Sequence, residues 1–86
     1  RARALPMPVV LRIEGFRFFF YSNEGDPPEA PHIHIRKAGA EAKFWLSPEA
    51  RLARNDGFDS RTLRRLAVLV EANCGQLERA WHDHFA

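Results

Sequence analysis

The chain has 86 residues, of which 45% are hydrophobic and 28% are charged, and its formal net charge is +2 at pH 7. This length and composition predict one soluble domain with a single core and exclude a two-domain protein. The sequence has no apolar run near 18 residues, which argues against a membrane span, and its single cysteine, Cys74, excludes an internal disulfide and a cysteine-based zinc site. We therefore expect a cytoplasmic protein without a cofactor.

The domain is expected to cover residues 7–86, because Met7 fits a natural start, and residues 1–6 are interpreted as a leader or as residues added for expression.

Two runs of alternating apolar residues open the domain, at residues 9–13 and 16–20. Only Glu14 and Gly15 separate them, which predicts a β-hairpin closed by a two-residue loop. That loop places Ile13 opposite Phe16, so that apolar residues meet across one face.

A second hairpin is predicted after a loop at residues 22–31, where prolines and other turn-forming residues exclude a paired strand. Its strands are residues 32–37 and 41–46, joined across residues 38–40 with Arg36 opposite Glu41. The two hairpins form one sheet with a core face and an outer face. The predicted core face carries Val9, Leu11, Ile13, Phe16, Phe18, Phe20, Ile33, Ile35, Ala42, Phe44 and Leu46. The predicted outer face carries Arg12, Arg17, Phe19, Tyr21, His32, His34, Arg36, Lys43 and Trp45.

Residues 47–57 fit two interpretations. Ser47-Pro48-Glu49 resembles a helix start, and the good helix formers that follow favour a short helix on propensity. The alternative is a turn followed by a fifth strand.

From Asp59 onward apolar residues recur at spacings of three and four, which predicts an amphipathic helix with Asp59 as its N-cap. We expect one long C-terminal helix from Ser60 to Phe85, kinked near Gly75. At 1.5 Å per residue it would be roughly 39 Å long, more than a small sheet covers. Its last turns, with Trp81 and Phe85, either pack on the sheet edge of their own chain or form a homo-oligomer contact.

His32 and His34 alternate on one strand and so point to the same side of the sheet. Three uses fit: a pair of metal ligands, a catalytic pair, or structural histidines stacked on Trp45. A metal would need a third ligand, for which the candidates are Glu24, Asp26, Glu29, Glu41, His82 and His84. The catalytic alternative is a metal-independent ribonuclease in which the histidines act as general acid and base. In that alternative the cations that steady the phosphate are Arg17, Arg36 and Lys43.

The expected outer face also interleaves aromatic and cationic side chains. The candidate binding residues are Arg17, Phe19, Tyr21, Arg36, Lys43 and Trp45. Aromatic platforms flanked by cations suit RNA bases, and interface cores favour the same residue types, so this pattern predicts binding of RNA or of a protein. A solvated polar sheet face is the plainer alternative.

Several segments resemble a small bacterial family, domain of unknown function 4160. These are residues 7–13 and 15–21, Pro31-His32-Ile33-His34, Glu41-Ala42-Lys43-Phe44, and the helix that ends in Ala80-Trp81. In the family two prolines directly precede the first histidine, whereas here Glu29 and Ala30 separate Pro27-Pro28 from Pro31. The resemblance implies a cognate operon partner in a toxin-antitoxin-like arrangement, and it favours a strand at residues 50–54.

The sequence therefore predicts an α+β fold, a mostly antiparallel sheet of four or five strands packed on one long helix. The leading functional hypothesis is a component of a toxin-antitoxin-like module that binds a cognate protein, with RNA as a second partner. The alternatives are a ribonuclease toxin that uses His32 and His34, and a metal-binding module.

Overall fold

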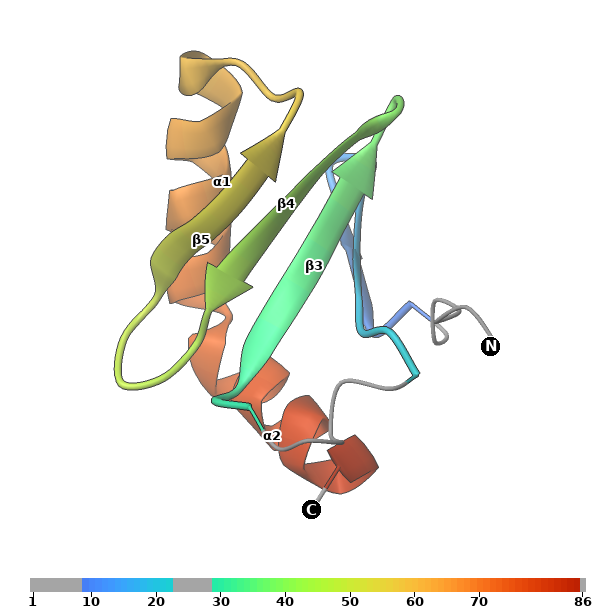
Figure 1. Ribbon diagram of the computed structural model, residues 1–86, viewed down its shortest axis with the longest axis vertical. Helices are drawn as coiled ribbons and strands as arrows, with labels where there is room; N and C mark the ends of the chain where they lie inside the picture. Colours follow the sequence, from blue (N-terminus) through green and yellow to red (C-terminus); the bar gives the residue numbers. More distant parts are fainter. Residues whose placement is uncertain (1–8, 23–28, 86) are drawn as a thin grey trace.

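The computed structural model describes residues 9–22 and 29–85, and it contains one antiparallel sheet and two helices (Figure 1). The elements are β1 (Leu11–Ile13), β2 (Phe16–Phe19), β3 (His32–Lys37), β4 (Ala40–Trp45), β5 (Arg51–Asp56), α1 (Ser60–Ala72) and α2 (Cys74–Phe85). The strands neighbour one another in chain order, β1-β2-β3-β4-β5, and each pairs antiparallel with the next. The predicted α+β class is confirmed. The expectation for residues 1–6 and most of the predicted loop, residues 23–28, lie outside the described residues.

The predicted β1–β2 hairpin is confirmed, with Ile13 opposite Phe16 and Leu11 opposite Phe18. Its two loop residues both have positive φ, 54° at Glu14 and 81° at Gly15. This is the backbone form that matches the twist of a two-residue hairpin, and it explains why a glycine occupies the second position.

The β3–β4 hairpin has the predicted register, including Arg36 opposite Glu41. Its loop is shorter than expected, because Lys37 pairs with Ala40 and leaves only Ala38 and Gly39 in the turn. Both have positive φ, 51° and 84°. The two hairpins join through β2 and β3, where Arg17 lies opposite Arg36.

The alternative of a short helix at residues 47–57 is wrong. β5 pairs with β4, with a register shift between Lys43 and Phe44 that leaves Ala53 as an extra residue on β5. All six β5 residues are exposed. Backbone pairing with β4 therefore overrides a helix propensity that amounts to only tenths of a kcal/mol per residue.

The single long helix is corrected to two, α1 and α2, divided at Asn73. The Asn73 side-chain amide donates to the Leu69 carbonyl at 2.8 Å, and its backbone N–H is shared between the carbonyls of Leu69 and Val70. A side chain that bonds to the preceding turn competes with the regular helix ladder, and Gly75 just beyond adds little helix propensity. The second helix then turns under the end of the sheet (Figure 1).

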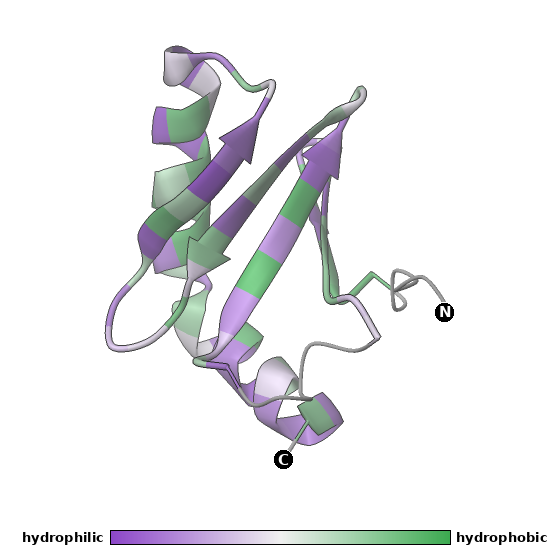
Figure 2. Cartoon of the chain, viewed as in Figure 1, coloured by the Kyte–Doolittle hydropathy of each residue, from purple (hydrophilic) through white to green (hydrophobic). Residues whose placement is uncertain are grey.

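The core lies between the helices and one face of the sheet. Along the strands hydrophobic and hydrophilic residues alternate (Figure 2), which separates the core face from the outer face. The buried cluster comprises Phe16, Phe18, Phe20, Ile33, Ile35, Ala42, Phe44, Leu46, Leu66, Leu69, Val70, Leu77 and Trp81. Trp81 packs on Phe20 of its own chain at 5.6 Å between ring centroids, which matches the first of the two expectations for the helix end.

Candidate functional site

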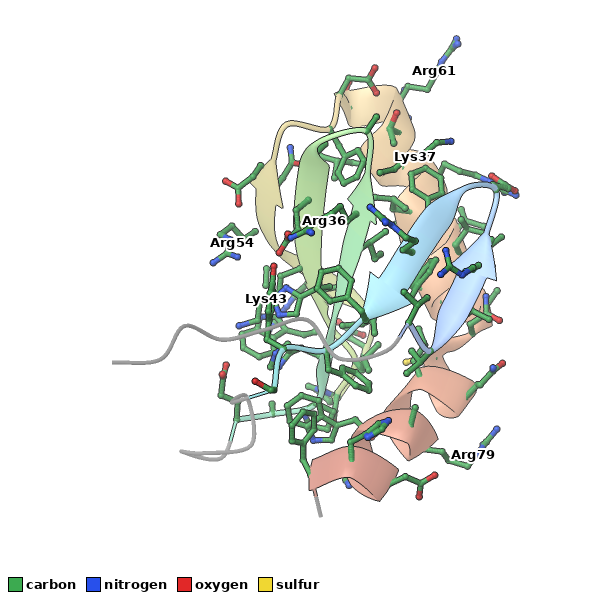
Figure 3. The ribbon with its side chains drawn as sticks, turned by 90° about the vertical axis from the view of Figure 1, so that its right-hand side faces the viewer. Arg36, Lys37, Lys43, Arg54, Arg61 and Arg79 are labelled. Carbon is green, nitrogen blue, oxygen red and sulfur yellow. The ribbon has the colours of Figure 1, made fainter. Side chains whose placement is uncertain are left out.

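The outer face, the sheet face opposite the core cluster, is arranged in cross-strand rows. One row runs over all five strands: Arg12, Arg17, Arg36, Glu41 and Asp56. The next row is Phe19, His34, Lys43 and Arg54. The third row is His32, Trp45 and Arg51. Figure 3 shows Arg36, Lys43 and Arg54 on this side, whereas Arg61 and Arg79 project from the helices.

A hydrogen-bonded cluster on the outer face joins Tyr21 and Arg36 to the carboxylate of Glu41. The Tyr21 hydroxyl lies 2.9 Å from both carboxylate oxygens. Arg36 donates to Glu41 Oε1 from Nε at 3.2 Å and from Nη2 at 2.8 Å, and Nη2 also donates to the Tyr21 oxygen at 3.1 Å. Burial and the hydrogen bond to Glu41 raise the pKa of Tyr21, and the hydrogen bond to Glu41 raises the pKa of Arg36.

His34 adjoins this cluster and is buried, with 3% of its surface exposed. Its Nδ1 lies 3.5 Å from Glu41 Oε2. Its ring stacks on Phe19 at 5.6 Å between centroids and meets the edge of Tyr21 at 4.7 Å. The strand alternation places this histidine correctly on the outer face, but neighbouring rings cover it.

His32 is completely buried, although it also lies on the outer-face side of β3. Its Nδ1 is 3.0 Å from the Ala30 carbonyl. The Trp81 ring from α2 lies 4.6 Å away between centroids, and Trp45 lies 5.7 Å away. Both histidines therefore lie on the predicted side of the sheet, but His32 is covered because α2 places Trp81 against its ring.

The aromatic rings of the outer face are also largely covered by neighbouring side chains. Phe19 is 3% exposed and has the Arg36 guanidinium 5.3 Å from its ring centroid. Trp45 is half-buried, and the Lys43 ammonium lies 4.5 Å from its centroid. Lys43 in turn forms an ion pair with Glu29 at 3.2 Å. Little free aromatic surface is left for a base to stack on.

The cations Arg12 and Arg17 are different, because both are exposed and lie directly opposite each other. Arg17 also lies directly opposite Arg36, so three arginines stand side by side on adjacent strands. Like charges at directly opposed positions destabilise a sheet. In the part of the chain that the structure describes, neither Arg12 nor Arg17 has an acidic partner, whereas Arg36 is paired with Glu41. Arg12 and Arg17 are therefore two neighbouring exposed cations whose charge no described carboxylate balances.

Two residues of the site were not among the candidates for catalysis or binding. Glu41 entered only as a metal-ligand candidate, yet it holds Tyr21, Arg36 and His34 together. The predicted hairpin register, which places Arg36 opposite Glu41, was the available signal. Trp81 was assigned to the helix stripe, and its contact with His32 had no signal in the sequence.

The described residues bring together no group of three or more His, Cys, Asp or Glu side chains that could hold a metal ion. Two of the candidate third ligands, Glu24 and Asp26, lie outside the described residues. His84 packs on Phe20, 5.7 Å between ring centroids, on the core side. Burial raises the pKa of the Cys74 thiol, whose sulfur lies 3.2 Å from the Leu46 carbonyl, as expected of a structural cysteine.

A hollow of about 290 Å³ lies away from this site, between the β3–β4 turn and the start of α1. Phe16, Phe58, Lys37 and Asp59 are among its lining residues. Its two charged groups already have partners, since Lys37 donates to the Glu14 carbonyl and Asp59 accepts from the Thr62 N–H. No predicted site residue lines it, so the outer face remains the candidate site.

In the described part of the chain, no helix is both long enough and apolar enough to span a membrane. Searches of curated proteins and of solved structures returned no match. The sequence model of one family, Domain of unknown function (DUF4160), matches residues 15–82. That stretch includes β2 to β5, α1 and most of α2, and with them His32, His34 and the six candidate binding residues. The chain therefore belongs to the DUF4160 family.

Proposed function

We propose that this protein is the component of a toxin-antitoxin-like module that binds its cognate protein through the outer face of the sheet. The observation that carries the proposal is the row of Arg12, Arg17 and Arg36. Three directly opposed arginines cost stability in the free chain, and an acidic partner segment would relieve that cost. The operon arrangement implied by the family resemblance supplies the context for such a partner.

An acidic protein segment fits this face better than single-stranded RNA. Base recognition without a duplex relies on aromatic rings with an open face. Here Phe19 is buried between His34 and Arg36, and Lys43 lies over Trp45. What remains accessible is charge, and arginine guanidinium groups pair well with carboxylates.

The test is calorimetric titration of the full chain with the product of the neighbouring gene. We expect micromolar or tighter binding that weakens as salt rises, because the contacting charges are exposed. The double variant R12A/R17A should weaken binding by tenfold or more, about 1.4 kcal/mol. The matched control removes two exposed arginines of the helices, R61A/R79A, and should bind as the wild type does.

Absence of binding at micromolar concentration, or equal binding by R12A/R17A and the wild type, would reject the proposal. A third outcome separates the two partner classes. If a single-stranded RNA oligonucleotide binds in an Arg12- and Arg17-dependent manner and the neighbour protein does not, the partner is nucleic acid and the protein-binding proposal fails.

A metal-independent ribonuclease is a second candidate, favoured by the convergence of Tyr21, His34, Arg36 and Glu41. In such a reaction a base removes the proton of the ribose 2′-OH, whose oxygen attacks phosphorus. An acid then protonates the departing 5′-oxygen, which leaves a 2′,3′-cyclic phosphate and a 5′-hydroxyl. His34 suits one of these roles, and Arg17, Arg36 and Lys43 would carry the phosphate charge.

For the ribonuclease reaction, the Phe19 and Tyr21 rings that cover His34 would have to move, because only 3% of that residue is exposed. Expression of the chain alone should then arrest growth and degrade RNA, and H34A should abolish both effects. H82A, which alters an exposed histidine of α2, is the control. Undiminished toxicity in H34A would reject the ribonuclease.

A further inference from the structure

The outer edge of β5 is the longest unpaired strand edge in the described part of the molecule. β5 is an end strand of the sheet, six residues long, whereas β1 at the opposite end has three. All six β5 side chains are exposed, among them Leu52 at 42%. Open strand edges invite pairing with another chain, and native proteins usually shorten or cover them.

Along each strand, alternate residues direct their backbone N–H and C=O groups to opposite neighbours, which shows which β5 residues have backbone groups that point away from the sheet. The Leu46 N–H donates to the Pro31 carbonyl, so alternate residues of β4, including Phe44 and Ala42, bond to β3. The intervening residues Glu41, Lys43 and Trp45 therefore bond to β5, through Asp56, Arg54 and Arg51. The backbone groups of Leu52 and Asn55 are left pointing away from the sheet.

Only one antiparallel register about a two-fold axis gives both of these residues a partner. It places Leu52 of one copy opposite Asn55 of the other, and the reverse. Each of these pairs can exchange two N–H to carbonyl bonds. The extra residue Ala53 falls at the centre, next to the axis, where no ladder hydrogen bond is required of it.

The same register aligns opposite charges. Arg51 of each copy comes to lie opposite Asp56 of the other, and both side chains are on the outer face because they neighbour Trp45 and Glu41. In the single chain Asp56 Oδ2 pairs with Arg54 at 3.2 Å, between two side chains that are more than half exposed. Among the described residues no partner is seen for its second carboxylate oxygen, which Arg51 of the other copy would reach.

The charged side chains of α1, the helix beside this edge, could also pair with those of a second copy. Arg65 forms an ion pair with Glu14, which turns that side of α1 toward the β1–β2 loop. At 100° per residue, Arg64, Ala67 and Glu71 lie on the side of α1 away from Arg65. The helix itself lies beside β5 (Figure 1). In an antiparallel helix pair centred near Ala67, Arg64 of one copy lies nearest Glu71 of the other.

We propose that two copies of this chain pair through β5 to form a continuous ten-stranded sheet, with Arg51 and Asp56 as reciprocal ion pairs. The proposal is independent of the partner-binding function, because that function uses the arginine row at the β1 side of the sheet. The occupant of the β5 edge is a second copy because the charges of this strand complement themselves in the one register that gives both Leu52 and Asn55 a partner.

Two charge reversals test the pairing. R51D alone places Asp opposite Asp twice, and D56R alone places Arg opposite Arg twice, so each variant should dimerise at least roughly tenfold more weakly than the wild type. A mixture of R51D and D56R restores both ion pairs in the heterodimer, and the double variant R51D/D56R restores them in the homodimer. Rescue by mixing also shows that each single variant is folded.

The measurement is sedimentation equilibrium over a concentration series, with R79D as a control for a charge change elsewhere. The wild type and R79D should approach twice the 9.9 kDa chain mass at about 100 μM. A wild type that stays monomeric at that concentration overturns the proposal. Dimerisation that is equal in all variants, or a mixture of R51D and D56R that remains monomeric, overturns it as well.

Discussion

Arg36 holds the carboxylate of Glu41 with two hydrogen bonds, 3.2 and 2.8 Å long, across the second residue pair of the β3–β4 hairpin. The local pairing is extended by a distant one, because Tyr21 reaches the same carboxylate from beyond β2. The cluster therefore ties two hairpins together at the centre of the outer face. It also gives Arg36 an acidic partner, which the neighbouring Arg12 and Arg17 lack among the described residues.

E41Q should destabilise the fold by about 1–3 kcal/mol, because Tyr21 and Arg36 lose a shared charged acceptor in a partly buried site. The pKa of Tyr21 should fall, because the hydrogen bond and the negative charge of Glu41 both raise it, whereas Arg36, which lowers it, remains. The chain has one tyrosine, so ultraviolet titration reads this group alone. E29Q, which removes an exposed carboxylate from Lys43, should change the free energy of unfolding by less than about 1 kcal/mol.

W81A should destabilise the fold by about 3–5 kcal/mol, because a buried ring packed on Phe20, His32 and Phe85 would leave a cavity. The other tryptophan provides the comparison. W45A removes a half-buried ring of the outer face and should cost clearly less. Urea unfolding followed by circular dichroism measures both, and equal losses would contradict the assignment of Trp81 to the core.

G57A should destabilise the fold more than G39A. Both glycines have positive φ, 109° and 84°, so an alanine is strained at either position by about 1–2 kcal/mol. A Cβ at Gly57 would in addition lie 3.2 Å from the Cβ of Ala40, whereas a Cβ at Gly39 meets nothing within 4 Å. Thermal unfolding of the two variants side by side decides the order, and a larger loss in G39A would show that crowding at Ala40 is relieved.

Stability should fall in acid partly through Asp59. Its carboxylate accepts the Thr62 N–H at 2.7 Å, which lowers its folded-state pKa. A group whose pKa is lower when folded stabilises the protein above its unfolded-state pKa, about 3.9 for aspartate. That contribution is lost as the pH falls through the folded-state value. Urea unfolding from pH 6 down to pH 2 should show a smaller acid loss for D59N, whose amide caps the helix without titrating. Parallel curves for D59N and the wild type would contradict this.

The strands and their pairing within each hairpin could be predicted from the sequence. Alternating residues assign each side chain to one of two faces, and a one-residue slip would exchange the faces entirely. This is why the predicted pairings of Arg36 with Glu41 and of Ile13 with Phe16 were correct. The helix pattern was also correct in phase, since Leu66, Leu77 and Trp81 are all buried.

The alternation of residues along a strand does not show which other elements cover each face of the sheet. Only the tertiary structure determined that. The break at Asn73 redirects α2, which brings Trp81 against His32 and buries this histidine of the outer face. The joining of β2 to β3 brings Arg17 beside Arg36 and Tyr21 within reach of Glu41. These contacts join residues 19 to 49 positions apart, and no local period encodes such distances. The sequence by itself thus determined which residues share a face, while long-range packing determined which of them remain accessible to a partner.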